Sequence, residues 1–375
     1  MHKNDFVRQL QTPGGSMRIR QALNLDYMLT GILMTLCAIS LLVIYSAGGQ
    51  STLYVKRQLV FIVAGFVVMG LVAQFPPRVW ERWAFLLYIA GIASLTAVLF
   101  VGVEINGAQR WLNLGFTRLQ PSEFMKICVP LMIASYIAKN AIPPTFRHVV
   151  LAVLLIFLPV FLVIQQPDLG TAILISASGF FVLFLAGLKR SYLISAFVLA
   201  LAALPSLWFF VMRDYQKQRV LTLLNPQQDK LGAGWNIIQS TTAIGSGGWS
   251  GKGWTKGTQS QLNFLPESHT DFIIAVLAEE FGLIGVLALC GLYLLLIGRC
   301  LFIGLNATSM FGRLIAGSIA FTLFIFIFVN LSMVSGILPV VGAPLPLISY
   351  GGTALMTLFV GFGILMSVAG DSKTR

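Results

Sequence analysis

The sequence predicts an all-α polytopic membrane protein, a bundle of about ten transmembrane helices with one large extracytoplasmic loop. Of its 375 residues 57% are hydrophobic and only 10% are charged, against about 25% charged in soluble globular domains. Its apolar runs repeatedly approach the roughly 20 residues that an α-helix needs to cross a bilayer. They do not alternate in strands of about ten residues, as a transmembrane β-barrel would require.

Ten apolar segments set the expected order of the helices. They cover residues 27–46, 59–73, 83–103, 124–138, 149–164, 171–187, 191–211, 272–297, 314–334 and 353–369. The first follows about 25 polar residues and is longer than a signal-peptide core, so we expect it to be retained. Because neither an internal repeat nor a break in composition is visible, we expect one membrane domain, 26–369, between an N-terminal tail, 1–25, and a C-terminal tail, 370–375.

The basic residues predict that both termini are cytoplasmic. In that orientation most of the basic residues in the tails and short loops lie on the inner side. They are Lys3, Arg8, Arg18, Arg20, Arg78, Arg82, Lys139, Arg147, Lys189, Arg190, Arg299, Arg313, Lys373 and Arg375. The short outer loops hold only Lys56, Arg57, Arg110 and Arg118. The large loop, about 212–271, then lies outside, since long loops are translocated regardless of their charge.

The net charge of +12 does not indicate a nucleic-acid partner, because the 25 Lys and Arg residues are spread singly or in pairs beside apolar segments. The four cysteines, Cys37, Cys128, Cys290 and Cys300, lie in or at the ends of apolar segments without disulfide or metal-binding spacing. We expect them to act as small hydrophobic residues.

Polar or irregular stretches from distant parts of the chain face the same outer side in this topology. They are 104–123, 165–170, 212–271 and 335–352. The last is apolar but too rich in proline and glycine to form a helix. Irregular backbone near membrane depth is tolerated where it is packed in protein or lines a cavity. We therefore expect a composite outer site with 335–352 as one wall.

Charged residues at two predicted helix starts have alternative interpretations. Glu123 and Lys126, just after the start signal Pro121, would share a helical face and pair. The pair either lets two charges enter the membrane together or lines a cavity and holds an anionic head group. Asp168, directly before an apolar segment, suits the capping of free N–H groups at least as well as substrate binding.

The glycine-rich run 243–253 is similar to a nucleotide-binding loop but fails its pattern. Ser246 stands where the first glycine is required, and Gly253 replaces the Ser or Thr that should follow Lys252. Its glycines and Lys252 remain able to bring N–H groups and a charge to a pyrophosphate. The alternative interpretation is a flexible surface loop.

Four of the chain's 13 acidic residues lie where the large loop meets an apolar segment: Glu267, Asp271, Glu279 and Glu280. If this stretch is helical throughout, a spacing of four places Glu267, Asp271 and Glu279 on one face. Asp271 lies at the outer, wet end in a partly apolar environment, which suits a general base.

Two further features of this stretch bear on its role. The run 272–297 would be about 39 Å long against a hydrocarbon core of about 30 Å, so the helix tilts or its first turns stand above the membrane. The single loop histidine, His269, has no evident carboxylate partner, and we expect it to be structural.

Several motifs together resemble the SEDS family (shape, elongation, division and sporulation) of bacterial peptidoglycan glycosyltransferases, over about residues 25–369. They are NGAQRW, QPSEFMK, QPDLGTA, GWNIIQS with AIGSGG and GKG, FLPESHTDFI and LPVVGAPLPLISYGG. The sequence of the large loop is more similar to the elongation branch, RodA, than to the division branch, FtsW.

The resemblance implies polymerisation of lipid II into glycan strands on the outer face of the bacterial inner (plasma) membrane during cell elongation. Asp271 of the HTDF motif would be the essential general base of an inverting glycosyl transfer, and Glu123 and Lys126 a functional pair beside the cavity. The candidates to neutralise the undecaprenyl pyrophosphate leaving group are Arg110, Lys126, Arg219 and Lys252.

The remaining supporting candidates are Gln120, Asp168, Glu267, His269 and Ser349. A divalent cation, Mg²⁺ or Mn²⁺, is a candidate to share the charge neutralisation, although no cluster of ligand residues in the sequence indicates where it would bind. The expected partners are lipid II, a class B penicillin-binding protein transpeptidase and the elongation machinery.

Two other functions are compatible with part of the sequence. A lipid II flippase would also place charges at the membrane boundary, and the lack of repeat symmetry argues only weakly against a transporter. A non-enzymatic scaffold for the cell-wall machinery would leave the outer carboxylates without a purpose.

Overall fold

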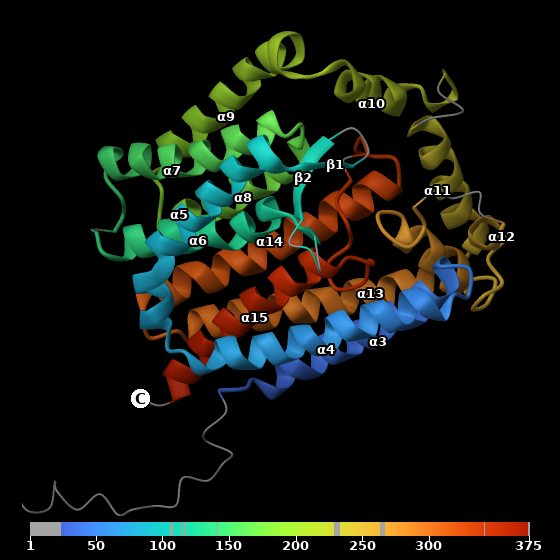
Figure 1. Cartoon of the computed structure of the whole chain (residues 1–375), viewed down its shortest axis with the longest axis horizontal. Coiled ribbons are helices and arrows are strands. Elements are labelled where there is room, and N and C mark those ends of the chain that lie inside the picture. Colours follow the sequence, from blue (N-terminus) through green and yellow to red (C-terminus); the bar gives the residue numbers. More distant parts are fainter. Residues whose placement is uncertain are drawn as a thin grey trace, which may run out of the picture.

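The computed structural model describes residues 24–105, 108–113, 115, 118–140, 142–228, 233–262, 267–340 and 342–373. The predicted N-terminal tail therefore lies almost entirely outside the described residues. Helices α3, α4, α13, α14 and α15 run side by side (Figure 1). The elements of the large loop lie beyond one end of these helices, opposite the C-terminus.

Each of the ten predicted apolar segments corresponds to a helix, which confirms the predicted fold class. These helices are α3 (Tyr27–Ala47), α4 (Thr52–Gln74), α5 (Pro77–Val101), α6 (Pro121–Ala138), α7 (Phe146–Gln165), α8 (Leu169–Leu185), α9 (Arg190–Ser206), α13 (Ile273–Leu305), α14 (Met310–Val334) and α15 (Gly352–Lys373). A π-helical turn, η1 (Leu207–Val211), continues α9. Helix α15 extends past the domain boundary expected at residue 369.

Seven of the described helices, α3, α4, α5, α7, α13, α14 and α15, are long and apolar enough to cross a membrane. Helices α8 and α9 are apolar but shorter. Helix α6 is the most enclosed: most of its residues are buried, and it packs against α5, α8 and α14. A helix in that position is surrounded by protein, so it is able to carry charged side chains that lipid would not accept.

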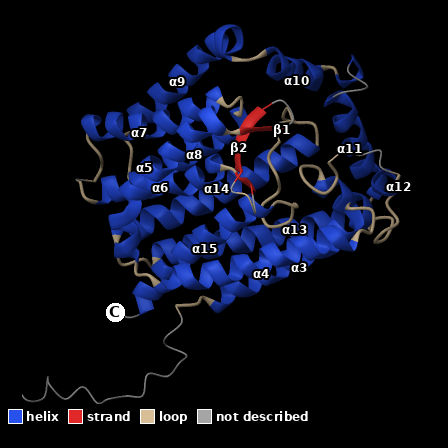
Figure 2. Ribbon diagram, viewed as in Figure 1, coloured by secondary structure: helices blue, strands red, loops and turns tan. Residues whose placement is uncertain are grey.

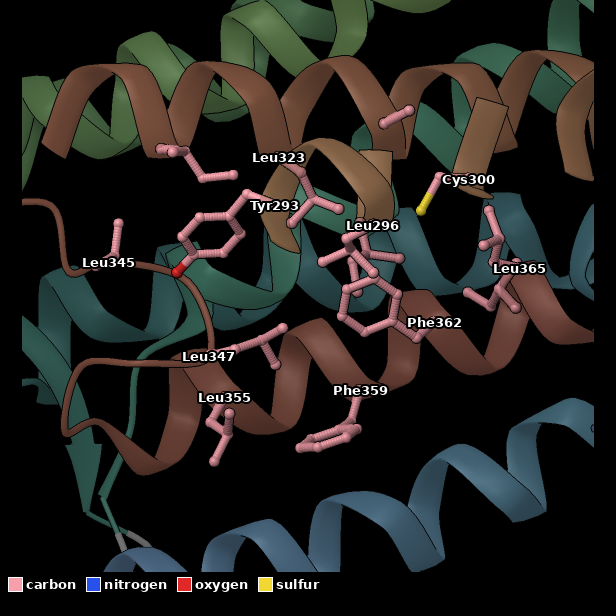
Figure 3. Close-up of a cluster of buried hydrophobic side chains, with 14 of the residues drawn as sticks. Tyr293, Leu296, Cys300, Leu323, Leu345, Leu347, Leu355, Phe359, Phe362 and Leu365 are labelled. Carbon is pink, nitrogen blue, oxygen red and sulfur yellow. The ribbon is translucent and has the colours of Figure 1, made fainter. Parts of the chain in front are cut away.

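The helices contact each other through closely packed side chains and through glycines. Figure 3 shows Leu296 of α13 next to Phe362 of α15 in the core, while Phe359 of α15 points toward α4. Helix α4 approaches α15 at Gly65, where an added Cβ would lie 2.1 Å from the ring of Phe359. Small residues at such crossings let two membrane helices come into close contact.

Three short strands, which the sequence did not predict, interrupt the helical pattern (Figure 2). They are β1 (Val103–Ile105), β2 (Ala108–Asn113) and β3 (Arg118–Leu119), paired antiparallel in the order β1-β2-β3. They connect α5 to α6. Residues 106–107 between β1 and β2, at which the NGAQRW motif begins, lie outside the described residues.

The large loop is mostly helical, so the interpretation of its glycine-rich run as a flexible surface loop is wrong. It contains α10 (Asp214–Leu224), the 3-10 turn η2 (Pro226–Gln228), α11 (Ala233–Gly247) and α12 (Thr258–Gln261). The run 243–253 forms the end of α11 and a turn that packs against α13.

The condition under which Glu267, Asp271 and Glu279 would share one helical face, a helix throughout this stretch, is not met. Residues 267–272 form a turn, in which the N–H of Thr270 donates to the oxygen of Glu267 at 3.0 Å. Helix α13 begins only at Ile273 and is interrupted at Gly282. As a result Glu267 is exposed while Glu279 is fully buried.

Candidate active site

The predicted pair of Glu123 and Lys126 forms within the membrane bundle. The Nζ of Lys126 lies 2.5 Å from Oε1 of Glu123, and both side chains are buried. The same Nζ lies 4.7 Å from the centre of the Phe326 ring. The pair lines a narrow cavity of about 70 Å³ with residues of α14, α15 and the loop 343–351. Both predicted features, charge pairing and the lining of a cavity, are therefore present.

A larger cavity of about 530 Å³ lies between α7, α8, η1, α10 and the loop 338–343. Most of its wall is apolar. Its polar side chains include Arg110, Asp168, Gln216 and Arg219. Leu174 and Ala343 line both cavities, so the two adjoin at these residues. A long apolar wall with cationic groups fits an amphiphile that has an anionic head.

Contacts of Arg110 and Asp168 join three of the sequence motifs at this larger cavity. Its Nη2 donates to the oxygen of Pro167 at 2.6 Å, and its Nη1 lies 3.6 Å from Oδ2 of Asp168. Asp168 also accepts from the N–H of Thr171 at 3.1 Å, which confirms its predicted capping of α8. Gln120 Nε2 approaches the same carboxylate at 3.5 Å.

Arg219 brings a second positive charge to the same cavity from helix α10. Its Nη1 donates to the oxygen of Val340 at 2.9 Å. The guanidinium is therefore held against the irregular loop, residues 335–352, which the sequence predicted as a wall of the site.

Asp271 lies where the turn 267–272 meets the irregular loop. Its Oδ2 is 3.5 Å from the position that a Cβ would take on Gly342, an ordinary van der Waals distance, and the φ of 76° at this position favours glycine. The next residue, Ala343, lines both cavities. Asp271 itself lines neither cavity, but its carboxylate lies against the neighbour of a residue that lines both.

The surroundings of Asp271 change its acidity. Burial and, to a smaller extent, the charge of Glu267 raise the pKa of the Asp271 carboxyl from 3.8 to about 7, against the lowering effect of Arg219. A carboxyl that titrates near neutral pH is a suitable general base, because it is ionised in a large fraction of molecules and still takes up a proton readily.

His269 and Ser349 connect the turn 267–272 to the irregular loop. The His269 ring packs 4.8 Å from the Tyr54 ring and 5.9 Å from the Tyr350 ring, and burial lowers its pKa. Ser349 Oγ donates to the oxygen of Thr270 at 2.6 Å. Both side chains make structural contacts, as expected for His269.

Sequence reasoning missed Asn330 of α14. Its Nδ2 donates to the main-chain oxygen of Asp271 at 2.9 Å and to that of Ala343 at 2.7 Å. The side chain is fully buried. A single amide inside the apolar run 314–334 is costly in a membrane, and that cost was the available signal.

Other buried side chains hold the irregular loop by its carbonyl groups. The donors are Tyr293 Oη to Pro346 at 2.5 Å, Ser40 Oγ to Ile348 at 2.7 Å and Gln58 Nε2 to Ser349 at 3.3 Å. These bonds satisfy main-chain groups that lipid would leave unpaired. The loop is thus a supported wall, as the sequence predicted.

Lys252, a predicted pyrophosphate ligand, is engaged elsewhere. Its Nζ lies 2.7 Å from Oε1 of Glu279, and its main-chain N–H donates to the oxygen of the same residue at 3.0 Å. A buried carboxylate therefore balances the charge of Lys252, and this side chain lines neither of the two cavities. The cations that line the two cavities within the described chain are Arg110, Lys126 and Arg219.

No group of three or more His, Cys, Asp and Glu side chains that could hold a metal ion occurs among the described residues.

The model of the cell cycle protein family of FtsW, RodA and SpoVE matches residues 21–374. The chain belongs to this family. The predicted resemblance to these SEDS proteins is thereby confirmed, and with it the multi-pass membrane architecture.

Relatives within the FtsW, RodA and SpoVE family cover nearly the whole chain. It is 56% identical over 345 residues to the peptidoglycan glycosyltransferase MrdB of Escherichia coli K12, with 92% of this chain and 93% of the relative covered. It is 34% identical to the probable peptidoglycan glycosyltransferase FtsW of Trichlorobacter lovleyi, with 93% of this chain and 94% of that relative covered.

Solved structures of family members have the same fold. One, from a peptidoglycan synthase complex described for the structural coordination of polymerization and crosslinking, has a TM-score of 0.82 at 32% identity and covers 93% of this chain and 99% of its own. The rod shape determining protein RodA of Thermus thermophilus has a TM-score of 0.69 at 30% identity. The match covers 92% of this chain and 97% of the RodA chain.

Proposed function

We propose that this peptidoglycan glycosyltransferase polymerises lipid II with Asp271 as its general base. The observation that carries the proposal is the position of a carboxyl with a pKa of about 7 against Gly342, next to the residue that lines both cavities. Its main-chain oxygen is held by Asn330. A fixed base of this acidity, one residue away from the point at which the two cavities adjoin, fits a reaction between two lipid-linked substrates.

The transfer requires one proton acceptor and one leaving group. The Asp271 carboxylate takes the proton of the 4-hydroxyl on the terminal GlcNAc of the acceptor. The freed oxygen forms a bond to C1 of the donor MurNAc from the face opposite the leaving group. The bond from C1 to the pyrophosphate oxygen breaks, and undecaprenyl pyrophosphate departs with the electron pair. Configuration at C1 is inverted.

The leaving group needs neutralisation of its charge more than protonation. Arg110 and Arg219 line the larger cavity, whose remaining wall is mostly apolar. Guanidinium groups match phosphate oxygens in geometry and stay charged at every physiological pH. We therefore assign the pyrophosphate to these two arginines and the first part of the polyprenyl chain to the apolar wall.

The Glu123–Lys126 pair has a supporting role in this proposal. It lines the narrow cavity on the other side of Ala343. Because each charge neutralises the other at 2.5 Å, the pair keeps a polar environment without adding net charge beside the second substrate.

The cellular setting follows from the predicted topology and the relatives. Asp271 and the large loop are assigned to the outer face of the bacterial inner membrane, and both termini to the cytoplasm. The likeness to a chain of a peptidoglycan synthase complex supports a transpeptidase partner of the class B penicillin-binding type. The 56% identity to MrdB supports a role in elongation.

Reconstituted protein given lipid II and the partner transpeptidase tests the function. We expect glycan polymer, and no polymer from Asp271→Ala with a normal elution profile. Leaflet exchange of fluorescent lipid II, measured on the same vesicles, is the second readout. Exchange above that of protein-free vesicles without polymer would contradict the proposal and favour a transporter.

A further inference from the structure

Helix α13 is interrupted close to Asp271 and is completed by another part of the chain. At Gly282 φ is 65° and ψ is −163°, so the arm Ile273–Phe281 is separate from the rest of the helix. Such a break leaves N–H and C=O groups without helical partners, which is costly when they are buried.

The segment 248–253 supplies those partners through four main-chain hydrogen bonds. They run from Lys252 N to Glu279 O at 3.0 Å, from Gly253 N to Glu280 O at 3.0 Å, from Leu283 N to Gly248 O at 2.9 Å and from Ile284 N to Trp249 O at 3.1 Å. Two bonds end on the arm and two begin on the remaining helix. The segment therefore bridges the break from both sides.

Glycines make this close contact possible. A Cβ on Gly247 would lie 2.0 Å from the oxygen of Ala278, and one on Gly251 would lie 2.1 Å from the oxygen of Glu280. Both distances are far below van der Waals contact, and both neighbours are main-chain atoms. The glycine-rich run thus serves an approach to a helix, where the sequence suggested an approach to phosphate.

A side-chain clamp adds to the backbone contacts. Oε1 of the fully buried Glu279 accepts from Lys252 Nζ at 2.7 Å, from Thr258 Oγ1 at 3.1 Å and from the N–H of Gln259 at 3.0 Å. The neighbouring Glu280 carboxyl accepts from the hydroxyl of Ser46 in α3. A buried carboxylate with a cation and two further donors holds the arm and the segment in one relative position.

We propose that the segment 247–259 is a positioning device for Asp271, and that Lys252 acts through Glu279. The arm begins two residues after Asp271, so a shift of the arm moves the carboxylate relative to Gly342 and Asn330. Neither Lys252 nor Glu279 lines the two cavities described above. The inference rests on the proposed role of Asp271 as the base.

Two glycines in α11 provide a matched test. Gly247→Ala forces the segment away from the arm, whereas Gly245→Ala adds a methyl group that meets nothing within 4 Å. We expect Gly247→Ala to lower kcat for polymerisation by about 100-fold, the loss that a misplacement of about 1 Å produces. We expect KM for lipid II to change by less than about 2-fold in both variants, and kcat to be preserved in Gly245→Ala. A normal kcat in purified, monodisperse Gly247→Ala would overturn the proposal.

A charge cycle tests whether Lys252 acts through Glu279. Lys252→Met leaves a buried carboxylate without its cation, and we expect kcat to fall at least about 10-fold. The double variant Lys252→Met with Glu279→Gln removes the unpaired charge, and we expect it to recover most of kcat. A ligand of the pyrophosphate would give no recovery in the double variant, and that result would overturn the proposal.

The two proposals fail in different ways. Polymer from Asp271→Asn would contradict the base, whatever the clamp variants do. Inactive Asp271→Asn together with fully active Gly247→Ala and Lys252→Met would contradict only the positioning device.

Discussion

The side chain of Asn330 is bonded to the main chain of Asp271, with 2.9 Å between Nδ2 and the aspartate oxygen. The same nitrogen donates to Ala343 at 2.7 Å. One buried amide in α14 therefore fixes the turn that carries the proposed base relative to the wall of both cavities. Several consequences of this arrangement are open to measurement.

Asn330→Leu keeps the approximate volume of the side chain but removes both donor bonds. Two buried carbonyls lose their partners, each at a cost of about 1–3 kcal/mol. We expect a lower Tm in detergent and a loss of kcat, since the turn is no longer fixed. Ser335→Ala, at the C-terminal cap of the same helix, is the control, because that hydroxyl donates to the carbonyls of Leu331 and Ser332 in its own helix. Equal kcat in the two variants would contradict the role of Asn330.

The pH dependence of kcat should follow the Asp271 carboxyl. A general base works in its ionised form, so activity should rise with pH through the pKa of about 7. The Glu267 charge raises this pKa and Arg219 lowers it. Glu267→Gln should therefore move the acidic limb to lower pH, and Arg219→Gln should move it to higher pH. Shifts of the same sign in both variants, measured in the polymerisation assay, would contradict this account.

Breaking the buried Glu123–Lys126 pair should destabilise the protein more than removing it. Lys126→Met leaves a carboxylate that is only 7% exposed without its cation, at a cost of about 3–5 kcal/mol. The double variant with Glu123→Gln should regain most of that loss. Thermal unfolding in detergent measures both. A double variant no more stable than Lys126→Met alone would show that the charge is balanced in another way.

Most of the fold could be predicted from the sequence because membrane helices follow local composition. All ten apolar segments became helices. The helices of the large loop were missed, because their polar surfaces carry no hydrophobic signal of that kind. The interruption at Gly282 was also missed, since it depends on hydrogen bonds to a segment about 30 residues earlier in the chain.

The site was predictable where it depends on short spacing. The three-residue spacing of Glu123 and Lys126 predicted their ion pair, and the position of Asp168 before α8 predicted its capping of that helix. Glu279 lies 27 residues from its partner Lys252, and Asp271 lies 59 residues from Asn330, and short spacing patterns do not predict such contacts. The pairing of Lys252 with Glu279 was therefore not anticipated, and Asn330 was overlooked.

The most direct test of the central claim compares wild type with Asp271→Asn in the polymerisation of lipid II, with the partner transpeptidase present. The amide keeps the size of the carboxyl but does not accept a proton at neutral pH. We predict no detectable polymer from Asp271→Asn, with Tm and elution profile equal to or better than those of wild type. Glycan polymer made by this variant at a rate within about 10-fold of wild type would contradict Asp271 as the general base.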